Sequence, residues 1–309
     1  MCKQALQQIA NSLYLNIQHV NNIGLLNGTT GCCIFLYLYA RYSKNSQYSD
    51  LAEELLEMIH DKLSVDLSLN FSTGLAGIGW AINYLALNNY IDLEEDGLEE
   101  IDAVIYNMQI EQFTTDIETE IPLFSKGLYA LHSTGDKDIL LRIVTEANDF
   151  LTSYEDPNIP LSYLNSIIYF ILGCKEQQIR TPSLQNLLEK IYSRLLISLT
   201  SNPYIEEEKR NLKYFITLLL STEDLIIEKE KWQELHTTLK LESCPQKEIN
   251  FNWLDLLSGK NSLLNCTPEK EFKQDINKYV ETKIQHLTAN NLGLQDGLAG
   301  LGCFLLQKS

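Results

Sequence analysis

The chain has 309 residues, 41 of them acidic and 24 basic, and its formal net charge is −17. Proteins bind nucleic acids and anionic membranes by neutralising phosphates with Lys and Arg, so this charge argues against both kinds of partner. A hydrophobic content of 45% indicates a folded chain, and only 7 prolines and 15 glycines argue against a turn-rich β protein.

The first residues, Met1-Cys2-Lys3-Gln4-Ala5, are not followed by the apolar core of a secretory signal. No run approaches the roughly 18 apolar residues that a membrane span needs, so no transmembrane segment is expected. Seven cysteines, an odd number without a spacing framework, suit free thiols in a reducing compartment. We therefore expect a cytoplasmic protein.

Most of the chain has the pattern of amphipathic helices. Apolar residues recur at helical spacing, with charged residues on the other faces. The predicted segments are 51–60, 139–150, 184–199 and 272–287. Convincing strands with a period of two residues are absent, so an all-α chain is predicted.

A second kind of helix lies between the amphipathic ones and is apolar on nearly all sides. The predicted segments are 31–40, 74–85 and 297–306. A helix that is apolar all round must be buried all round. Amphipathic outer helices that alternate with buried inner helices indicate a closed or stacked helical array.

The apolar helices belong to an internal repeat. Residues 74–80, GLAGIGW, match residues 297–303, GLAGLGC, and Gly28 and Gly31 have the same spacing of three. Weaker echoes begin near Gly127, Asn165, Asn211 and Gly259, which gives about seven inner helices with a period of roughly 40–50 residues. Paired glycines give a helix a bare face that a neighbouring backbone can approach closely. The alternative is that backbone N–H groups at these helix starts contact a ligand.

Three stretches of this repeat resemble lanthionine synthetase C-like (LanC-like) proteins. Residues 24–31, GLLNGTTG, followed by an apolar helix and 50–56, DLAEELL, resemble the first repeat of that family. Residues 71–82, FSTGLAGIGWAI, resemble the second, and 294–302, LQDGLAGLG, resemble the last. The resemblance implies one α/α toroid (α/α barrel) domain of about seven helical hairpins over residues 1–309, with an inner ring of apolar and an outer ring of amphipathic helices.

The resemblance also implies a chemistry. Family enzymes hold zinc at the centre of the inner ring, where it activates a peptide cysteine that adds to dehydroalanine or dehydrobutyrine to form a thioether. Zinc suits this reaction, because the thiolate is the nucleophile and zinc binding deprotonates a thiol.

This chain departs from the family at the expected zinc ligands. The family has a cysteine at the start of the fifth inner helix and a Cys-His-Gly at the start of the sixth. Here the fifth corresponds to residues 206–213, without cysteine, and the sixth resembles Leu257-Ser258-Gly259. The third repeat lacks the family's aspartate before Gly127, and Asn165-Ser166 replaces a His-Gly pair in the fourth. No Cys-His pair occurs anywhere in the chain. Stable protein zinc sites use Cys, His and carboxylates, so no zinc or other cofactor is expected.

The other cysteines and histidines give little evidence of a metal site. His236, Cys244 and Cys266 lie in the corresponding part of the chain, but they are not closely spaced and a fourth ligand is missing. Three further cysteines lie inside apolar helices and are interpreted as small hydrophobic residues: Cys32, Cys33 and Cys303. The five histidines are dispersed, mostly on outer helices, and are not interpreted as bases.

The first functional hypothesis is a catalytically degenerate LanC-like protein. It would bind a Cys/Ser/Thr-containing precursor peptide, or a modification enzyme, during lanthipeptide-type biosynthesis. The candidate binding residues precede or open the inner helices at the mouth of the expected cavity: Asn27, Thr29, Ser72, Thr73, Ser125, Lys126, Asp255, Ser258, Lys260 and Asp296. The competing interpretation of these side chains is helix capping, since Ser, Thr, Asn and Asp favour helix starts.

Two enzymatic alternatives remain open. An active thioether-forming cyclase would need an atypical metal site. A glycoside hydrolase-like enzyme on the same toroid would need two carboxyl groups across a cavity, which Asp296, Asp255 and Glu206 to Glu208 could supply. The acidic run 206–208 has a simpler interpretation as a solvated helix start, which the helix dipole favours.

Overall fold

The computed structural model of the chain describes residues 2–64, 67–94, 96–107, 122–133, 136–154, 159–179, 181–201, 206–221, 228–239, 276–295, 297–307 and 309. These residues form thirteen α-helices and two short 3-10 helices joined by turns and loops, and they contain no strand. The prediction of an all-α chain is therefore confirmed for the described residues.

The chain divides into two compact units. Unit 1 comprises Met1–Asn107 together with Ile249–Ser309, and unit 2 comprises Met108–Glu248. A single domain over residues 1–309 stays a prediction.

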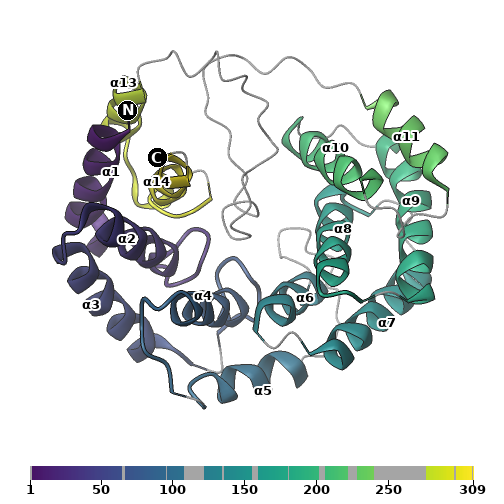
Figure 1. Cartoon of the computed structure of the whole chain (residues 1–309), viewed down its shortest axis with the longest axis horizontal. Helices are drawn as coiled ribbons and strands as arrows, with labels where there is room; N and C mark the ends of the chain where they lie inside the picture. The colour runs from purple at the N-terminus through teal and green to yellow at the C-terminus, as the bar shows by residue number, and fades with distance from the viewer. Residues whose placement is uncertain are drawn as a thin grey trace. The chain divides into compact units, whose positions relative to one another are not determined.

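Unit 1 is built from two rows of helices (Figure 1). The outer row consists of α1 (Lys3–Asn16), α3 (Gln47–Lys62), α5 (Glu99–Asn107) and α13 (Ile276–Gln285). The inner row consists of α2 (Thr29–Ser43), α4 (Leu75–Leu87) and α14 (Leu298–Gln307), and it places α2 between α14 and α4. Each row packs against the other: α1 contacts α2 and α14, α3 contacts α2, and α5 contacts α4. The first and last repeats of the chain therefore lie side by side within this unit.

The two kinds of helix have the burial that their sequences predict. On α3 the buried residues are Tyr48, Ala52, Leu55 and Ile59, whose spacings of four and three place them on one face. On α14 every residue from Leu298 to Leu305 is buried. An amphipathic helix covers the core with one stripe, whereas an apolar helix needs neighbours on all sides.

Unit 2 repeats the pairing of inner and outer helices. The inner row consists of α6 (Pro122–Ser133), α8 (Leu161–Glu176) and α10 (Glu206–Leu220), and the outer helices are α7 (Lys137–Ser153), α9 (Pro182–Ser201) and α11 (Lys229–Thr238). α6 and α10 both pack against α8, and the outer partners of α6, α8 and α10 are α7, α9 and α11 respectively. The start of α10 is charged and not apolar, so the second unit follows the predicted pattern less closely.

The predicted helices lie where the sequence places them. Segments 31–40, 51–60, 139–150 and 184–199 fall inside helices, and 74–85 and 297–306 are helical from their second residue. Segment 272–287 corresponds to α13, with 272–275 outside the described residues. The echoes at Gly127, Asn165 and Asn211 lie in α6, α8 and α10, and the echo at Gly259 is outside the described residues.

Candidate functional site

Three loops of unit 1, each leading into an inner helix, are joined by main-chain hydrogen bonds. The Leu26 N–H donates to the Ser72 carbonyl at 2.8 Å, and the Gln295 N–H donates to the Leu26 carbonyl at 2.9 Å. The Asn27 side chain also donates to the Gln295 side chain at 3.4 Å. We name residues 22–28, 68–74 and 292–295 the loop platform. It connects segments that are more than 260 residues apart in the chain, namely the first and last repeats.

In unit 1, the N–H group of the first or second residue of each inner helix is already hydrogen-bonded within the loop platform. Thr29 N–H donates to the Asn22 carbonyl at 2.9 Å, and Leu75 N–H donates to the Ser68 carbonyl at 2.8 Å. At α14, the Ala299 N–H donates to the Leu292 carbonyl at 3.0 Å. Each loop thus caps its own helix from seven residues back. Because helix starts bind anions through free N–H groups, these occupied donors favour the packing interpretation over ligand binding.

Glycine at the helix starts makes this capping possible. A Cβ atom on Gly28 would meet the backbone of Gly24 and Asn22, and one on Gly74 would meet the carbonyls of Ser68 and Asn70. At Gly77 a Cβ would meet the Phe71 carbonyl. The bare helix face predicted from the sequence is therefore filled chiefly by the helix's own preceding loop.

Four predicted binding residues lie in the loop platform or at its edge. Asn27, Ser72 and Thr73 are half-buried, and Thr29 is fully buried. The hydroxyls of Thr29 and Thr73 bind within their own loops, to the Asn22 carbonyl at 3.1 Å and to the Asn70 Oδ1 at 2.9 Å.

The capping interpretation is wrong for Asn27, Thr29 and Thr73. The N-cap residues of α2 and α4 are Gly28 and Gly74, and they are held by main-chain bonds. Asn27 instead joins its loop to the last one through Gln295, and Thr29 and Thr73 hold the conformation of their own loops. The exposed surface of the platform offers neutral amide and hydroxyl groups.

The residue patterns did not point to Gln295, which is exposed and carries both the main-chain and the side-chain link to the first repeat. A positional signal existed. Gln295 lies two residues before Gly297, as Leu26 and Ser72 lie two residues before Gly28 and Gly74.

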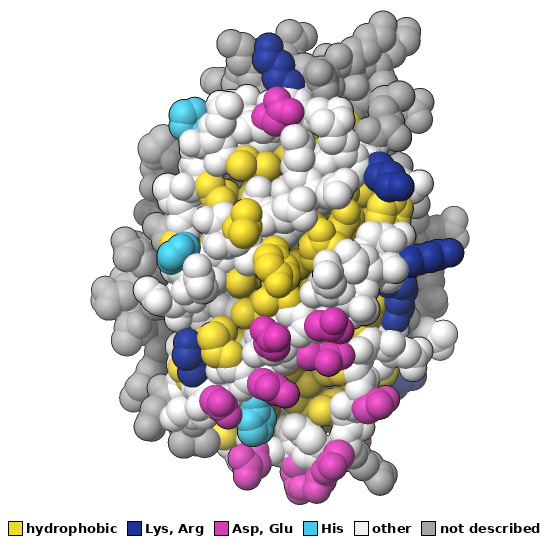
Figure 2. Space-filling view, turned by 90° about the vertical axis from the view of Figure 1, so that its left-hand side faces the viewer, with side chains coloured by type: hydrophobic (Ala, Val, Ile, Leu, Met, Phe, Trp, Pro, Cys, Tyr) yellow, Lys and Arg dark blue, Asp and Glu magenta, His cyan; other side chains and the backbone are white. Residues whose placement is uncertain are grey.

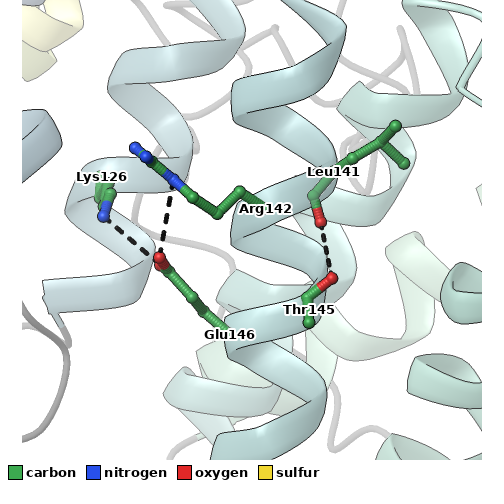
Figure 3. Close-up of polar contacts among 5 residues, drawn as sticks. All are labelled: Lys126, Leu141, Arg142, Thr145 and Glu146. Carbon is green, nitrogen blue, oxygen red and sulfur yellow. Dashed lines mark hydrogen bonds and ion pairs between the residues drawn. The ribbon is translucent and has the colours of Figure 1, made fainter.

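The predicted residues Ser125 and Lys126 lie in unit 2, in α6, and both are buried. Lys126 is only 2% exposed, and its Nζ lies 3.4 Å from Oε2 of Glu146 on α7. Arg142, one helical turn before Glu146, lies 3.8 Å from the other carboxylate oxygen. Figure 3 shows Lys126 and Arg142 converging on Glu146. The ammonium group is thus engaged between an inner and an outer helix.

The remaining four predicted residues are outside the described part of the chain: Asp255, Ser258, Lys260 and Asp296. The same holds for Cys244, Cys266 and the expected start of the sixth inner helix.

The start of the fifth inner helix does not fit a zinc site in the part that the structure describes. Side chains at the start of α10 are described from Glu208 onward, and Lys209, Arg210 and Asn211 follow without cysteine or histidine. The Asn165 side chain, on the neighbouring α8, donates to the Glu208 carbonyl at 3.0 Å. Among all described residues, no three His, Cys, Asp or Glu side chains come together as a metal-binding group.

The described thiols are also poorly suited to bind a metal. Cys32, Cys33, Cys174 and Cys303 are free and buried. Burial raises the pKa of Cys32 and of Cys174 to about 12, and it also raises the pKa values of Cys33 and Cys303. A metal binds the thiolate, so thiols that stay protonated are weak ligands. The prediction that Cys32, Cys33 and Cys303 act as small hydrophobic residues is confirmed.

The histidine nearest to the expected metal region lies on the outer helix α11. The Nε2 atom of His236 is 3.1 Å from the Thr217 hydroxyl on α10. Its pKa is lowered, first by partial burial and then by the nearby Lys213 ammonium group. This histidine packs α11 onto α10, and among the described residues it belongs to no group of three or more potential metal ligands.

Comparison with known families now decides the classification. Residues 19–266 match the family described as lanthionine synthetase C-like protein. The chain belongs to this LanC-like family. The match covers most of the chain, and the resemblance identified from the sequence is confirmed. The helical structure agrees with the α/α toroid that the resemblance implies. No curated protein and no solved structure matches the chain significantly.

None of the described helices is both long enough and apolar enough to cross a membrane.

Proposed function

We propose that this LanC-like chain is a catalytically degenerate member of its family. It binds a Cys/Ser/Thr-containing precursor peptide, or a modification enzyme, in lanthipeptide-type biosynthesis. The loop platform is the proposed binding surface, and the absence of any Cys-His pair from the sequence is the observation that carries the loss of zinc chemistry.

The chemistry of the loop platform supports binding of a peptide. Peptide backbones present N–H and C=O groups, which amide and hydroxyl side chains bind without regard to charge. The Asn27 and Gln295 side chains lie beside each other at the surface. Ser72 lies beside Leu26 of the first loop, through a main-chain hydrogen bond. The main-chain bonds between the loops hold these groups in place before a peptide binds, which lowers the entropic cost of binding.

Zinc content tests the catalytic part of the proposal. Purified full-length protein without a metal-binding tag should contain close to no zinc by elemental analysis. A stoichiometry near one zinc per chain would overturn the proposal, because it would require a ligand set without an adjacent Cys-His pair and would favour a cyclase.

A binding experiment tests the other part. The probe is a fluorescein-labelled synthetic peptide that contains one cysteine and one dehydroalanine, titrated in fluorescence anisotropy. We expect saturable binding. The free thiol of the peptide, measured by alkylation and mass spectrometry, should decrease no faster than it does without protein.

The variant Asn27→Ala/Gln295→Ala should weaken binding at least about fivefold, as loss of two hydrogen-bonding side chains implies. The matched control Gln47→Ala/Asn88→Ala removes two exposed amides of unit 1 and should bind normally. These residues follow the C-terminal ends of α2 and α4, whereas the loop platform precedes the N-terminal ends of these helices. Equal binding by both variants would exclude the platform as the site.

A further inference from the structure

The negative charge of this protein is concentrated in one quarter of the chain. Residues 45–125 contain 17 of the 41 acidic residues and only one of the 24 basic residues, Lys62. This segment carries a net charge of −16, and the rest of the chain has −1. The segment contains α3 and α5, so the outer helices of unit 1 are where we expect a surface that suits a basic partner.

Within this segment, α3 presents a stripe of exposed carboxylates. Asp50, Glu54, Glu57 and Asp61 follow one another at spacings of four, three and four residues, which places them on one face of the helix. All four are exposed, together with Glu53. The first three and Glu53 make no ion pair or hydrogen bond through their side chains in the described structure, and Asp61 meets only exposed His60, at 3.9 Å. Like charges at these spacings repel one another, and no Lys or Arg among the described residues pairs with this stripe.

The neighbouring outer helix adds exposed apolar side chains. On α1, Tyr14 is 51% exposed and Leu15 is 68% exposed. Both follow Asn11 at helical spacing, and the Asn11 Oδ1 accepts a hydrogen bond from the Tyr48 hydroxyl at 2.8 Å. That bond fixes the first turn of α3 beside the face of α1 that bears Tyr14 and Leu15. Figure 2, which views the side of α1 and α3, shows a band of apolar side chains with acidic ones gathered on one side of it.

From this arrangement we propose that the outer face of α1 and α3 docks a basic amphipathic helix of a partner protein. Apolar residues of that helix contact Tyr14 and Leu15, and its Lys and Arg residues pair with the carboxylate stripe of α3. The stripe from Asp50 to Asp61 spans about 16 Å, which corresponds to three helical turns of a partner. A second copy of this chain is disfavoured as the occupant, because it would bring two such stripes together.

This surface is separate from the loop platform, and the proposal does not depend on the proposed function. The outer helices of unit 2 have a different character. α7, α9 and α11 each carry acidic and basic residues together, and Arg142 pairs with Glu146 and Lys231 with Glu228. These helices therefore supply matched controls.

The test uses full-length protein and a labelled 18-residue helical peptide with Leu on one face and Lys on the other. Affinity is measured by fluorescence anisotropy at 50 and 200 mM NaCl. The variant Asp50→Asn/Glu54→Gln/Glu57→Gln should bind at least about tenfold more weakly at the lower salt, with a shallower salt dependence. The control Glu189→Gln/Glu230→Gln/Glu234→Gln removes the same charge from exposed positions on α9 and α11, and it should change affinity less than about twofold. Equal weakening in both variants would overturn the proposal and show only diffuse attraction.

The apolar part has its own control. Leu15→Ser should weaken the peptide about fivefold, whereas Leu196→Ser, at a 45% exposed position on α9, should not. A counterpart peptide with Glu in place of Lys should not bind, and equal binding of both peptides would overturn the charge assignment. Sedimentation of the unmodified protein should detect no self-association. Self-association that is lost in Leu15→Ser would mean that a second copy covers this face, and the proposal would be wrong. Because all substitutions are at exposed positions, thermal melts should show folded variants.

Discussion

The inner helices of the two units begin in different ways, although both belong to one repeat. In unit 1 the helix starts are glycines, and the preceding loops fill the space with main-chain carbonyls. In unit 2 side chains make comparable connections: Lys126 reaches Glu146, and Asn165 reaches the Glu208 carbonyl. Where a main-chain carbonyl caps the helix, the glycine beside it has no room for a Cβ atom. Where a side chain makes the connection, a substitution costs less free energy of unfolding. In the described residues, a glycine directly before an inner helix is found where the preceding loop wraps that helix, as at Gly28, Gly74 and Gly297.

The substitution Gly77→Ala in unit 1 should cause the largest loss of stability. A methyl group would collide with the Phe71 carbonyl, which belongs to the backbone and cannot move without shifting the loop. We expect a loss of about 2–4 kcal/mol in the free energy of unfolding by urea denaturation. The matched control is Gly173→Ala in unit 2, where the new methyl meets only the flexible end of Leu131. Alanine is the better helix former, so this change should be nearly neutral. Equal losses at both positions would contradict the distinction.

Removing one partner of the buried ion pair should have the next largest effect. Glu146→Gln leaves the Lys126 ammonium, which is 2% exposed, without this carboxylate, and should cost about 1–3 kcal/mol. Lys126→Met should cost less, because methionine replaces the apolar stem and Glu146 is partly exposed and still near Arg142. Urea denaturation of both variants measures the difference. Greater damage from Lys126→Met would show that Lys126 stabilises α6 by contacts other than this pair.

Alkaline pH tests a property that the two units share, namely protonated buried thiols. Burial raises the pKa of Cys174 from 9.0 to about 12, so the folded state keeps the proton at pH 10 while the unfolded state loses it. Stability is therefore fully present below pH 9 and decreases above it, by about 1.4 kcal/mol per thiol at pH 10. Cys174→Ala should reduce the loss between pH 8 and pH 10 by that amount, and Cys32→Ala should do the same in unit 1. An unchanged loss in either variant would show that the thiol ionises in the folded state.

The smallest expected effect concerns the charge of the outer helices. Glu57→Gln on α3 removes repulsion with Glu53 and Asp61, one turn away on either side, and should stabilise the protein by a few tenths of a kcal/mol. Glu281→Gln on α13 makes the same chemical change at a carboxylate that lies three residues after Lys278 and accepts a hydrogen bond from the Gln8 side chain. It should be slightly destabilising. Opposite signs in paired thermal melts would support the view that the stripe of α3 is maintained at the expense of stability. The same sign for both would argue against it.

Much of the fold could be predicted from the residues themselves. The alternation of amphipathic segments such as 51–60 with apolar segments such as 31–40 predicts the helices and their two rows, because burial follows directly from which faces are apolar. The repeated GLAG stretches led to the correct family. The candidate site was less predictable. Asn27 and Ser72 lie in the loop platform, and their role in binding stays a prediction. Lys126 is engaged in an ion pair, and no residue pattern predicts the contacts of Gln295.

What the sequence determined by itself was periodicity, repeat and composition: helices, an inner and an outer set, free buried thiols, and no adjacent Cys-His ligands. Each of these depends on residue type and local spacing, which can be read directly from the sequence. The tertiary structure decided how distant segments meet. The bonds of Leu26 to both Ser72 and Gln295, and of Tyr48 to Asn11, join residues whose separation in sequence gives no local signal. Such contacts arise only when packed helices bring their loops and faces together. They create the loop platform and place the acidic face of α3 beside α1.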